Sequence, residues 1–260
     1  FTYVSHDLKT PLTLILSPLQ RLIKQKQIDN NDREKLEVIY RNANRMNYLI
    51  NELLTFSKIE MKQMRISVRK GDIMHFLEEL SHIFDIVAGE REIDFIVNLE
   101  DTEEEVWFSP SKLERILYNL LSNAFKYTQP GGYVKLSAKL IKEEKGTFVQ
   151  ISVKDNGRGI PKEAQEQIFE SYYQVEKRDH REGFGLGLSL TRSLIHMHKG
   201  EIRVESEINK GSDFIVTLNV SEDAYNPDER SSENITTEEI QKYNLRMKET
   251  IELIPDQLIS

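Results

Sequence analysis

Hydrophobic residues within the first 66 positions recur at alternating steps of three and four residues, which is the heptad spacing of a helical stripe. The first stripe comprises Leu12, Ile15, Leu19 and Leu22, and the second comprises Leu36, Ile39, Ala43, Met46, Ile50 and Leu53. The polar segment 28–32 separates them and predicts a turn, in which Asn31 or Asp32 caps the second helix. One hairpin cannot enclose both stripes, so we predict that two copies pair as a dimeric four-helix bundle.

The N-terminal end of the first stripe is irregular. Val4, Leu8 and Leu12 are separated by two consecutive four-residue steps, a stutter that locally unwinds a supercoil. Pro11 lies in the same turn and removes a helical hydrogen bond, so we expect a bend there. His6 lies off the stripe, and we expect its side chain to face solvent one turn before the bend.

From about Gly71 the pattern changes to a mixture of helical and strand-like segments. Helices are expected at 72–88, 110–125, 161–168 and 185–198, and strands at 93–98, 105–108, 133–141, 147–154, 201–207 and 213–220. Ser109 followed by Pro110 is typical of an N-cap and the first helical position. Such a mixture predicts an α+β sandwich, with a sheet on one side and helices on the other.

These patterns divide the chain into a helical domain at 1–66, an α+β domain at 67–220 and a tail at 221–260. The tail holds ten acidic and four basic side chains, a balance of −6 within a formal net charge of −8. It offers one weak amphipathic segment, at 238–253, so we predict an acidic and poorly ordered linker. The remaining charge of −2 leaves no basic face for nucleic acid, and nothing indicates a lipid-binding patch.

Composition excludes further classes of site. The absence of cysteine excludes disulfides and thiolate metal sites, and it fits a reducing compartment. The sequence holds no run of 18 apolar residues and no signal-peptide pattern. Because it begins at Phe1, only five residues before His6, we expect it to be part of a longer protein.

Five short motifs occur in order along residues 1–220. They are SHDLKTPL at 5–12, NLLSNAFKYT at 119–128, DNGRGI at 155–160, IFE at 168–170 with Tyr172 and Tyr173 after it, and GFGLGL at 183–188. In this order and spacing they resemble the phospho-acceptor box, N box, first glycine box, F box and second glycine box of bacterial sensor histidine kinases. Each motif alone is weak evidence, whereas the ordered set is highly specific to that family.

The resemblance implies a dimerisation and phospho-acceptor domain, followed by an ATP-binding domain of the type shared with gyrase and heat-shock chaperone ATPases. It implies transfer of the γ-phosphoryl group of ATP to His6, with Mg²⁺ as cofactor, and relay to an aspartate on a response-regulator receiver domain, either separate or fused. Thr10 stands where the family orients water for dephosphorylating that partner, so a phosphatase activity is implied as well. The chain would be the cytoplasmic portion of an inner-membrane sensor, attached to the membrane only through upstream segments.

The acceptor box can also be interpreted from its residues. A lone exposed histidine on a helix is most often an ordinary surface residue, and its neighbours alone set His6 apart from the other five histidines. A neutral imidazole has a nucleophilic nitrogen, and a carboxylate that takes the proton of the other nitrogen strengthens it. Asp7 must reach round by rotamer choice to do this, because adjacent residues diverge on a helix. Many relatives have the longer glutamate at this position.

Asn119 and Asn123 are four residues apart, so they lie on one face of the predicted helix. The spacing alone equally fits two polar residues on an exposed face. With the resemblance, the amide oxygen of Asn123 becomes a candidate Mg²⁺ ligand, since magnesium takes few protein ligands. Asn119 and Lys126 would then contact the phosphates, and Tyr127 would pack on the adenine.

The two glycine boxes complete the candidate nucleotide site. Asp155 follows a predicted strand and could accept the adenine amino proton, while Gly157 and Gly159 would permit close approach, although such sequences also form ordinary turns. In the second box, backbone N–H groups at the start of a helix would bind phosphate, behind a polar loop at 171–182 that fits a mobile lid. The resemblance adds the remaining candidate contacts, which are Ile160, Phe169, Gly183, Gly185, Leu186, Gly187 and Leu188.

Three alternatives stay open at this point. A related ATPase of the gyrase, chaperone or mismatch-repair type would share the nucleotide pocket without needing the histidine box. A non-catalytic dimeric scaffold would keep the fold, and a protein kinase could act on serine. The segment LILSPL at 14–19 resembles hybrid kinases of gut Bacteroidetes, and the acidic tail would suit a linker to a fused receiver domain.

Overall fold

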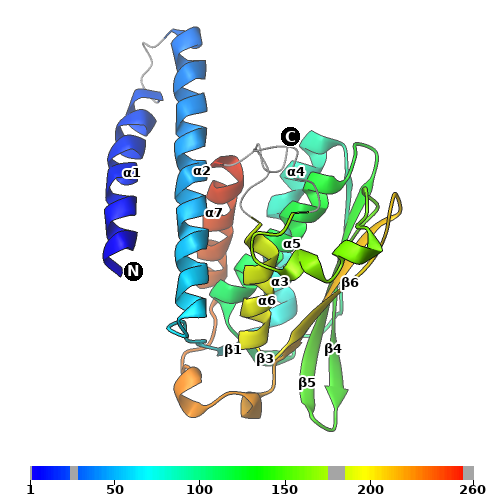
Figure 1. Ribbon diagram of the computed structural model, residues 1–260. Coiled ribbons are helices and arrows are strands. Elements are labelled where there is room, and N and C mark those ends of the chain that lie inside the picture. Colours follow the sequence, from blue (N-terminus) through cyan, green and yellow to red (C-terminus); the bar gives the residue numbers. More distant parts are fainter. Residues whose placement is uncertain (1, 24–28, 175–184, 254–260) are drawn as a thin grey trace. The chain divides into compact units, whose positions relative to one another are not determined.

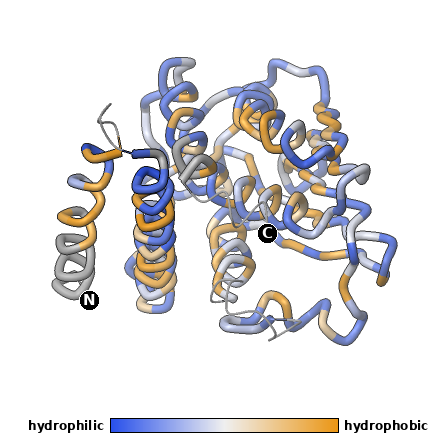
Figure 2. The backbone as a smooth tube through the Cα atoms, turned by 90° about the horizontal axis from the view of Figure 1, so that it is seen from above, coloured by the Kyte–Doolittle hydropathy of each residue, from blue (hydrophilic) through white to orange (hydrophobic). Residues whose placement is uncertain are grey.

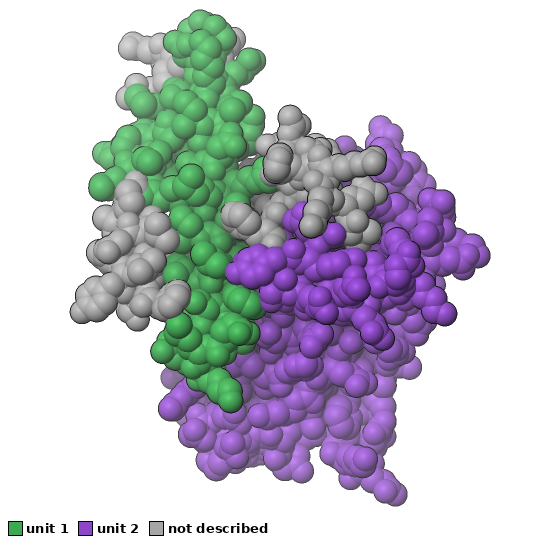
Figure 3. Space-filling model, viewed as in Figure 1, with its two compact units in different colours: residues 1–64, 250–255 green, residues 65–249, 256–260 purple. Residues whose placement is uncertain are grey.

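The computed structural model describes residues 2–23, 29–174 and 185–253, and for residues 2–11, 13, 30, 249, 250, 252 and 253 it describes the backbone alone. Its two compact units consist mainly of residues 1–64 and 65–249 (Figure 3). Within the described ranges, no helix combines the length and the apolar character that a membrane crossing needs. The first unit is helical and the second contains both helices and strands, so both predicted architectures occur.

The first unit is a helical hairpin of α1 (Thr2–Ile23) and α2 (Asn30–Glu60), as the heptad spacing predicts (Figure 1). The prediction that Asn31 or Asp32 caps α2 is wrong, because Asp29 occupies the N-cap position. The carbonyl of Asp29 accepts the first helical hydrogen bond, from Arg33 N–H at 2.9 Å. Asp32 lies inside the first turn, where a carboxylate complements the positive end of the helix dipole.

In a single chain the two hydrophobic stripes are only partly covered. Leu12 and Leu54 are buried, whereas Ile39 and Met46 keep 50% and 54% of their surface exposed. Hydrophobic and hydrophilic positions alternate along α2 (Figure 2). An uncovered apolar stripe of this kind favours association with another helical surface.

The second unit is an α+β sandwich. Its five-stranded sheet has the order β2-β4-β5-β7-β6, in which β2 and β4 are parallel and the other neighbours are antiparallel. These strands are β2 (Asp94–Leu99), β4 (Tyr133–Glu143), β5 (Gly146–Asp155), β6 (Glu201–Glu207) and β7 (Gly211–Asn219). One face of the sheet is covered by α3 (Ile73–Ser81), α4 (Ile83–Arg91), α5 (Pro110–Tyr127) and α6 (Gly187–Met197) (Figure 1).

Alternation along the strands explains why one face of the sheet is covered. In β5, Val149, Ile151 and Val153 are buried, whereas Gln150 and Ser152 between them are partly exposed. Hydrophobic side chains from the helices meet this inner face. The fully buried phenylalanines of the core are Phe76, Phe84, Phe108 and Phe125.

The prediction of one helix at 72–88 is wrong, because α3 and α4 are separate helices that meet at His82. The Ser81 hydroxyl donates to the Glu78 carbonyl at 2.7 Å, and the His82 N–H reaches the same oxygen at 3.3 Å. A hydroxyl that bonds back to its own helix competes with the backbone ladder and bends the helix. Sharing of this acceptor therefore accounts for the break.

Two short elements also differ from the prediction. Strand β1 (Arg69–Asp72), with sequence RKGD and no hydrophobic alternation, was not predicted, yet it pairs antiparallel with β3 (Glu105–Phe108). The predicted helix at 161–168 is instead two 3₁₀ turns, η1 (Lys162–Ala164) and η2 (Gln167–Phe169). The other predicted strands and helices of this unit are confirmed to within a few residues at each end.

The start of α5 is held by a buried histidine rather than by its N-cap side chain. Ser109 occupies the N-cap position, but its side chain forms no capping hydrogen bond, so the predicted side-chain cap is wrong. The backbone N–H of Ser109 donates to Nε2 of His198 at 3.2 Å, and Nδ1 of His198 lies 2.9 Å from the Leu194 carbonyl. Burial lowers the pKa of His198 to about 4, so the ring is neutral and joins the start of α5 to the end of α6.

Residues 221–253 are folded, which contradicts the prediction of a poorly ordered tail for that stretch. Tyr225 keeps only 2% of its surface exposed and forms a hydrophobic cluster with Ile66 and Val68. Its hydroxyl donates to the Asn219 carbonyl at 2.5 Å. The backbone of the tail then runs beside the residues that lead into β1, since the Val68 N–H donates to the Glu229 carbonyl at 2.8 Å.

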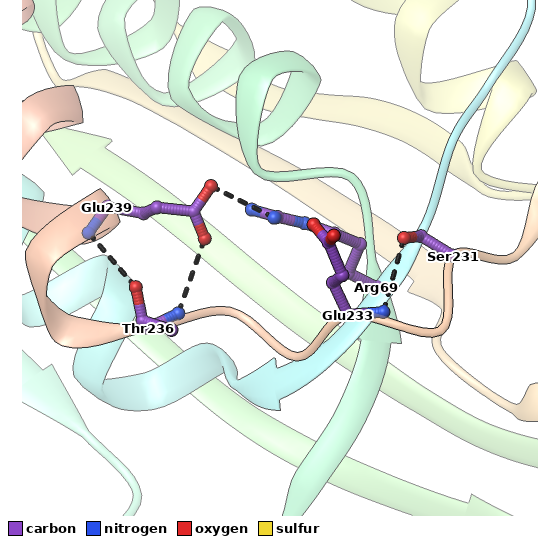
Figure 4. Close-up of polar contacts among 5 residues, drawn as sticks. All are labelled: Arg69, Ser231, Glu233, Thr236 and Glu239. Carbon is purple, nitrogen blue, oxygen red and sulfur yellow. Dashed lines mark hydrogen bonds and ion pairs between the residues drawn. The ribbon is translucent and has the colours of Figure 1, made fainter.

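The last helix, α7 (Thr237–Leu253), is tied to β1 and α3. A carboxylate oxygen of Glu239 lies 2.9 Å from a guanidinium nitrogen of Arg69, and reciprocal 3.4 Å hydrogen bonds between Thr236 and Glu239 cap the helix (Figure 4). The Arg69 hydrogen bond lowers the pKa of the Glu239 carboxyl. Farther along α7, the ring of Tyr243 meets Phe76 edge-on, with centroids 5.6 Å apart. The hydrophobic residues of the tail are therefore buried against side chains of the α+β unit.

The neutral state of His198 predicts a pH dependence of stability. The unfolded histidine takes up a proton near its ordinary pKa of about 6.5, whereas the folded one resists protonation down to about 4. The contribution of His198 is therefore lost as the pH falls, by on the order of 2 kcal/mol between pH 7 and pH 5. Urea unfolding at both pH values should show a steeper loss for the wild type than for His198→Gln.

Two buried carboxyl groups instead make the folded state more stable as the pH falls. The test is therefore the difference in slope between the wild type and the variant, and not the slope of the wild type alone. Burial raises the pKa of Glu114 to about 7 and that of Asp155 to about 6, and both effects persist in the variant. His196→Gln changes an exposed histidine on the same helix and should keep the wild-type slope. Equal slopes for wild type and His198→Gln would contradict the assignment of a neutral buried ring.

Burial of the tail predicts a large effect at Tyr225. Tyr225→Ala removes an aromatic side chain from a closed cluster and should lower the free energy of unfolding by about 3–5 kcal/mol. Tyr225→Phe loses the hydroxyl alone and should cost about 1 kcal/mol. Leu245→Ala, at a position on α7 that is 60% exposed, should change stability by less than about 0.5 kcal/mol. A Tyr225→Ala effect as small as that of Leu245→Ala would show that the tail is not part of the fold.

Candidate functional site

The polar face of α5 carries the four N-box candidates. Asn119, Asn123, Lys126 and Tyr127 are all half-buried, while the hydrophobic face of the same helix is buried in the core. Periodicity of 3.6 residues places these side chains along one stripe of the helix. The structure therefore confirms the shared face predicted for Asn119 and Asn123.

Asn119 brings the N box into contact with the second glycine box. Its Nδ2 donates to the Thr191 hydroxyl on α6 at 2.8 Å. Its Oδ1 lies so close to Gly187 that a Cβ on that residue would come within 2.5 Å of it. Glycine is required at 187 by this close approach, since a side chain there would displace the Asn119 amide.

Asn123 has an amide that is available to a ligand. It forms no hydrogen bond with any residue that the structure describes. The described residues also contain no cluster of three or more histidine, aspartate or glutamate side chains that could hold a metal ion. A single amide oxygen beside a polyphosphate suits Mg²⁺, which keeps most of its waters and binds phosphate oxygens, so these residues fit such an ion.

Tyr127 is flanked by two cations. The guanidinium carbon of Arg158 lies 4.2 Å from the centroid of the Tyr127 ring, and the Lys126 ammonium lies 5.2 Å from it. The Arg158 backbone N–H also donates to the Tyr127 carbonyl at 3.3 Å, which ties the first glycine box to the end of α5. Sequence reasoning did not single out Arg158, whose position within DNGRGI was the only available signal.

Asp155 ends β5 as a buried carboxylate with one oxygen already bonded. Its Oδ1 accepts from the backbone N–H of Gly157 at 2.8 Å and of Ser212 at 3.3 Å. No residue in the described ranges donates to its other oxygen. Burial raises the pKa of Asp155 to about 6, the nearby Asp213 raises it further, and the two backbone donors oppose them. The free oxygen can accept a proton donor from a ligand.

The rest of the first glycine box is anchored to the turn between β6 and β7. The Ile160 N–H donates to the Ser206 hydroxyl at 2.8 Å, and this hydroxyl lies 3.0 Å from that of Ser212. Gly159 has a φ of +70°, and a Cβ on it would come within 2.0 Å of the Glu207 carbonyl. Sequence reasoning missed Ser206 and Ser212, because the residues they contact lie more than 40 positions away.

The remaining predicted residues lie near the start of α6 or outside the described part of the chain. Leu186 is buried at the N-cap of α6, Gly187 begins the helix, and Leu188 is half-buried. The Gly185 carbonyl accepts from the Tyr172 N–H at 2.9 Å. Phe169, in η2, packs edge-on against Phe214 with centroids 6.4 Å apart. Gly183 and most of the predicted lid at 171–182 lie outside the described residues.

The acceptor candidates lie in the first unit. Helix α1 contains His6, Asp7 and Thr10. The structure describes the backbone of these residues but not their side chains. His6 and Thr10 are four residues apart on that helix and so share a face. The predicted solvent exposure of His6 and its contact with Asp7 stay predictions.

Together, the residues of the second unit suit a nucleoside triphosphate. A carboxylate oxygen is open to an amino group, and an aromatic ring and a lysine lie at the end of α5. The first backbone N–H groups of α6 have no acceptor within their own helix, and the N-cap side chain of Leu186 supplies none. Two asparagine amides lie between these groups along α5. This arrangement can bind a purine at one end and phosphates at the other.

Comparison with known families agrees with this division. Residues 1–62 match the His Kinase A (phospho-acceptor) domain, and residues 108–222 match the histidine kinase-, DNA gyrase B-, and HSP90-like ATPase family.

Two curated relatives and one solved structure are among the most similar proteins. The chain is 33% identical to Histidine kinase P4 of Formosa agariphila, over 100% of this chain and 19% of that protein. It is 34% identical to Hybrid signal transduction histidine kinase D of Dictyostelium discoideum, over 84% of this chain and 14% of that protein. The crystal structure of full-length ShkA in complex with AMPPNP has a TM-score of 0.74 at 25% identity, covering 85% of this chain and 45% of that one.

The chain thus spans less than a fifth of the length of these two curated relatives. Both of its units match the family, one as the phospho-acceptor domain and the other as the ATPase domain. The chain belongs to the sensor histidine kinase family, of which it contains the catalytic core.

Proposed function

We propose that this chain transfers the γ-phosphoryl group of ATP to His6. The observation that carries the proposal is the convergence of three separate motifs in the second unit. Asn119 contacts Gly187 and Thr191, and Arg158 contacts Tyr127, so the N box and both glycine boxes meet. The acceptor box precedes them in a unit that matches the phospho-acceptor domain.

In the proposed nucleotide complex, the free oxygen of Asp155 accepts the adenine amino proton and Tyr127 packs on the base. Asn119 and Lys126 contact the phosphates. Backbone donors at the start of α6 complete the phosphate contacts. The residues assigned to the walls and loops of the site are Gly157, Gly159, Ile160, Phe169, Gly183, Gly185, Leu186, Gly187 and Leu188. The amide oxygen of Asn123 would hold Mg²⁺, and the bound ion would supply charge neutralisation at the phosphates.

The transfer itself is an in-line displacement. One imidazole nitrogen of His6 bonds to the γ-phosphorus as the bond from that phosphorus to the β,γ-bridging oxygen breaks. ADP leaves with the bonding electron pair, and Asp7 accepts the proton of the other ring nitrogen. Positioning and charge stabilisation supply most of the rate enhancement in such reactions.

The working unit is a homodimer, because the exposed stripe that includes Ile39 and Met46 needs a partner and a second hairpin supplies it. Phosphohistidine is then relayed to an aspartate of a receiver domain, separate or fused, and Thr10 serves the reverse dephosphorylation. The resemblance to a relative named as a hybrid kinase supports a fused arrangement. We assign the chain to the cytoplasmic portion of a membrane sensor by analogy with the family.

His6→Gln should abolish the acid-labile label that γ-labelled ATP leaves on the protein, because glutamine has no nucleophilic ring nitrogen. Calorimetric ATP binding should persist, since the nucleotide site lies in the other unit. His82→Gln, at an exposed histidine, should label like the wild type. Acid-labile label on His6→Gln would overturn the acceptor assignment, and phosphate release without any label would instead favour a related ATPase.

Asn123→Ala should weaken the binding of ATP in the presence of Mg²⁺ about tenfold, because it removes the single protein ligand assigned to the ion. In EDTA the wild type and the variant should bind alike. The melting temperature should hardly change, since the amide bonds to no described residue. Asn98→Ala, at an exposed position on β2, is the matched control. If the variant bound ATP as tightly as the wild type in Mg²⁺ as well as in EDTA, Asn123 would not be a ligand of the ion.

A further inference from the structure

Thr191 is a buried polar residue that lies outside every motif of the nucleotide site. It lies on α6, four residues after Gly187, and keeps only 1% of its surface exposed. Its hydroxyl accepts the hydrogen bond from Nδ2 of Asn119 at 2.8 Å. Burial of a hydroxyl costs free energy unless the hydroxyl is hydrogen-bonded, so the bond to Asn119 accounts for a polar residue at this buried position.

The other hydroxyls on α6 do not make a contact of this kind. Ser189 donates to the Leu186 carbonyl at 2.9 Å, and Ser193 donates to the Ser189 carbonyl at 3.0 Å. Both bonds stay within the helix or its N-cap. The bond between Thr191 and Asn119 joins α6 to α5 through two side chains, whereas the other bond between these helices joins the His198 ring to the backbone of Ser109.

Asn119 is held on two sides as a result. Its nitrogen is bonded to Thr191, and its oxygen lies against Gly187, where a Cβ would come within 2.5 Å. Asn123, four residues further along α5, has no such bond to any described residue. The two N-box amides therefore differ in order, one fixed before a ligand arrives and the other not.

We propose that Thr191 is a positioning residue for the phosphate end of the nucleotide site. It fixes the plane of the Asn119 amide, so that the second N–H is directed to the ligand without an ordering cost on binding. It also fixes α5 relative to the start of α6, whose backbone donors meet the phosphates. The inference rests on the proposed function, because Asn119 must contact the nucleotide for its orientation to matter.

The first test compares two substitutions at Thr191. Valine keeps the volume and removes the hydroxyl, whereas serine keeps the hydroxyl. With AMPPNP and Mg²⁺ in calorimetry, Thr191→Val should raise the Kd about fivefold, which corresponds to about 1 kcal/mol. Thr191→Ser should stay within about twofold of the wild type. Ser193→Ala removes a hydroxyl from the same helix without touching Asn119 and should leave the Kd unchanged.

A double-mutant cycle separates positioning from general loss of structure. In an Asn119→Ala background, Thr191→Val should have no further effect on the Kd, because the amide that it orients is gone. A fivefold loss in both backgrounds would make Thr191 a merely structural residue, and no loss in the wild-type background would overturn the inference.

A measurement without nucleotide keeps this inference distinct from the proposed function. In a ¹⁵N spectrum of the free protein, the side-chain amide of Asn119 should shift and exchange faster with solvent in Thr191→Val, whereas that of Asn123 should not change. An unaffected Asn119 amide would overturn the positioning role even if ATP binds. Suppose instead that the Asn119 amide signal changes in Thr191→Val but the wild type binds no AMPPNP. The positioning role would then hold, and the proposed function would be wrong.

Discussion

The nucleotide site depends on one constraint, which is that α5 must bury one face and keep the opposite face open to a ligand. Rotation of the helix about its axis would exchange the two faces, so both ends have to be held. The Ser109 N–H is bonded to His198 at the start of the helix, and the Arg158 N–H is bonded to the Tyr127 carbonyl at its end. The bond from Asn119 to Thr191 adds a third point in the middle. With α5 fixed in this way, the other glycine-box contacts can form at defined distances.

Sequence periodicity predicts the face of α5 but not the residues that hold it. Asn119 and Asn123 share a face because helices repeat every 3.6 residues, and that information is local. The partners His198 and Thr191 lie 89 and 72 positions away from the residues they contact, so no spacing rule reaches them. The ordered motifs predict which loops meet through family resemblance, whereas the buried hydroxyls and the neutral imidazole are set by tertiary packing.

The order of the tail at 221–253 also depends on residues that are distant in the sequence. A prediction from composition considers only the hydrophobic core that a segment can form by itself. Residues 221–253 are acidic and their hydrophobic residues are widely spaced, so composition predicts disorder for them. The structure buries Tyr225 against Ile66 and Val68, and it pairs Arg69 with Glu239. Ile66 and Val68 belong to the segment that leads into β1, and Arg69 is the first residue of that strand. An element can thus be ordered by surfaces that another part of the chain supplies, which an assessment of its own composition misses.

Asp155 shows how burial can convert a costly group into a selective one. Desolvation raises its pKa to about 6, so at pH 7 the carboxylate is still mostly ionised. Two backbone donors stabilise one oxygen, and the other has no donor among the described residues. A buried acceptor of this kind favours a base that offers an amino hydrogen, as adenine does. In the proposed nucleotide complex it would reject guanine, whose carbonyl at the same ring position would face the carboxylate, because two facing acceptors both stay unpaired. Selectivity at such a site arises mainly from the cost of leaving the carboxylate oxygen without a donor, and that cost exists only because β5 ends inside the protein.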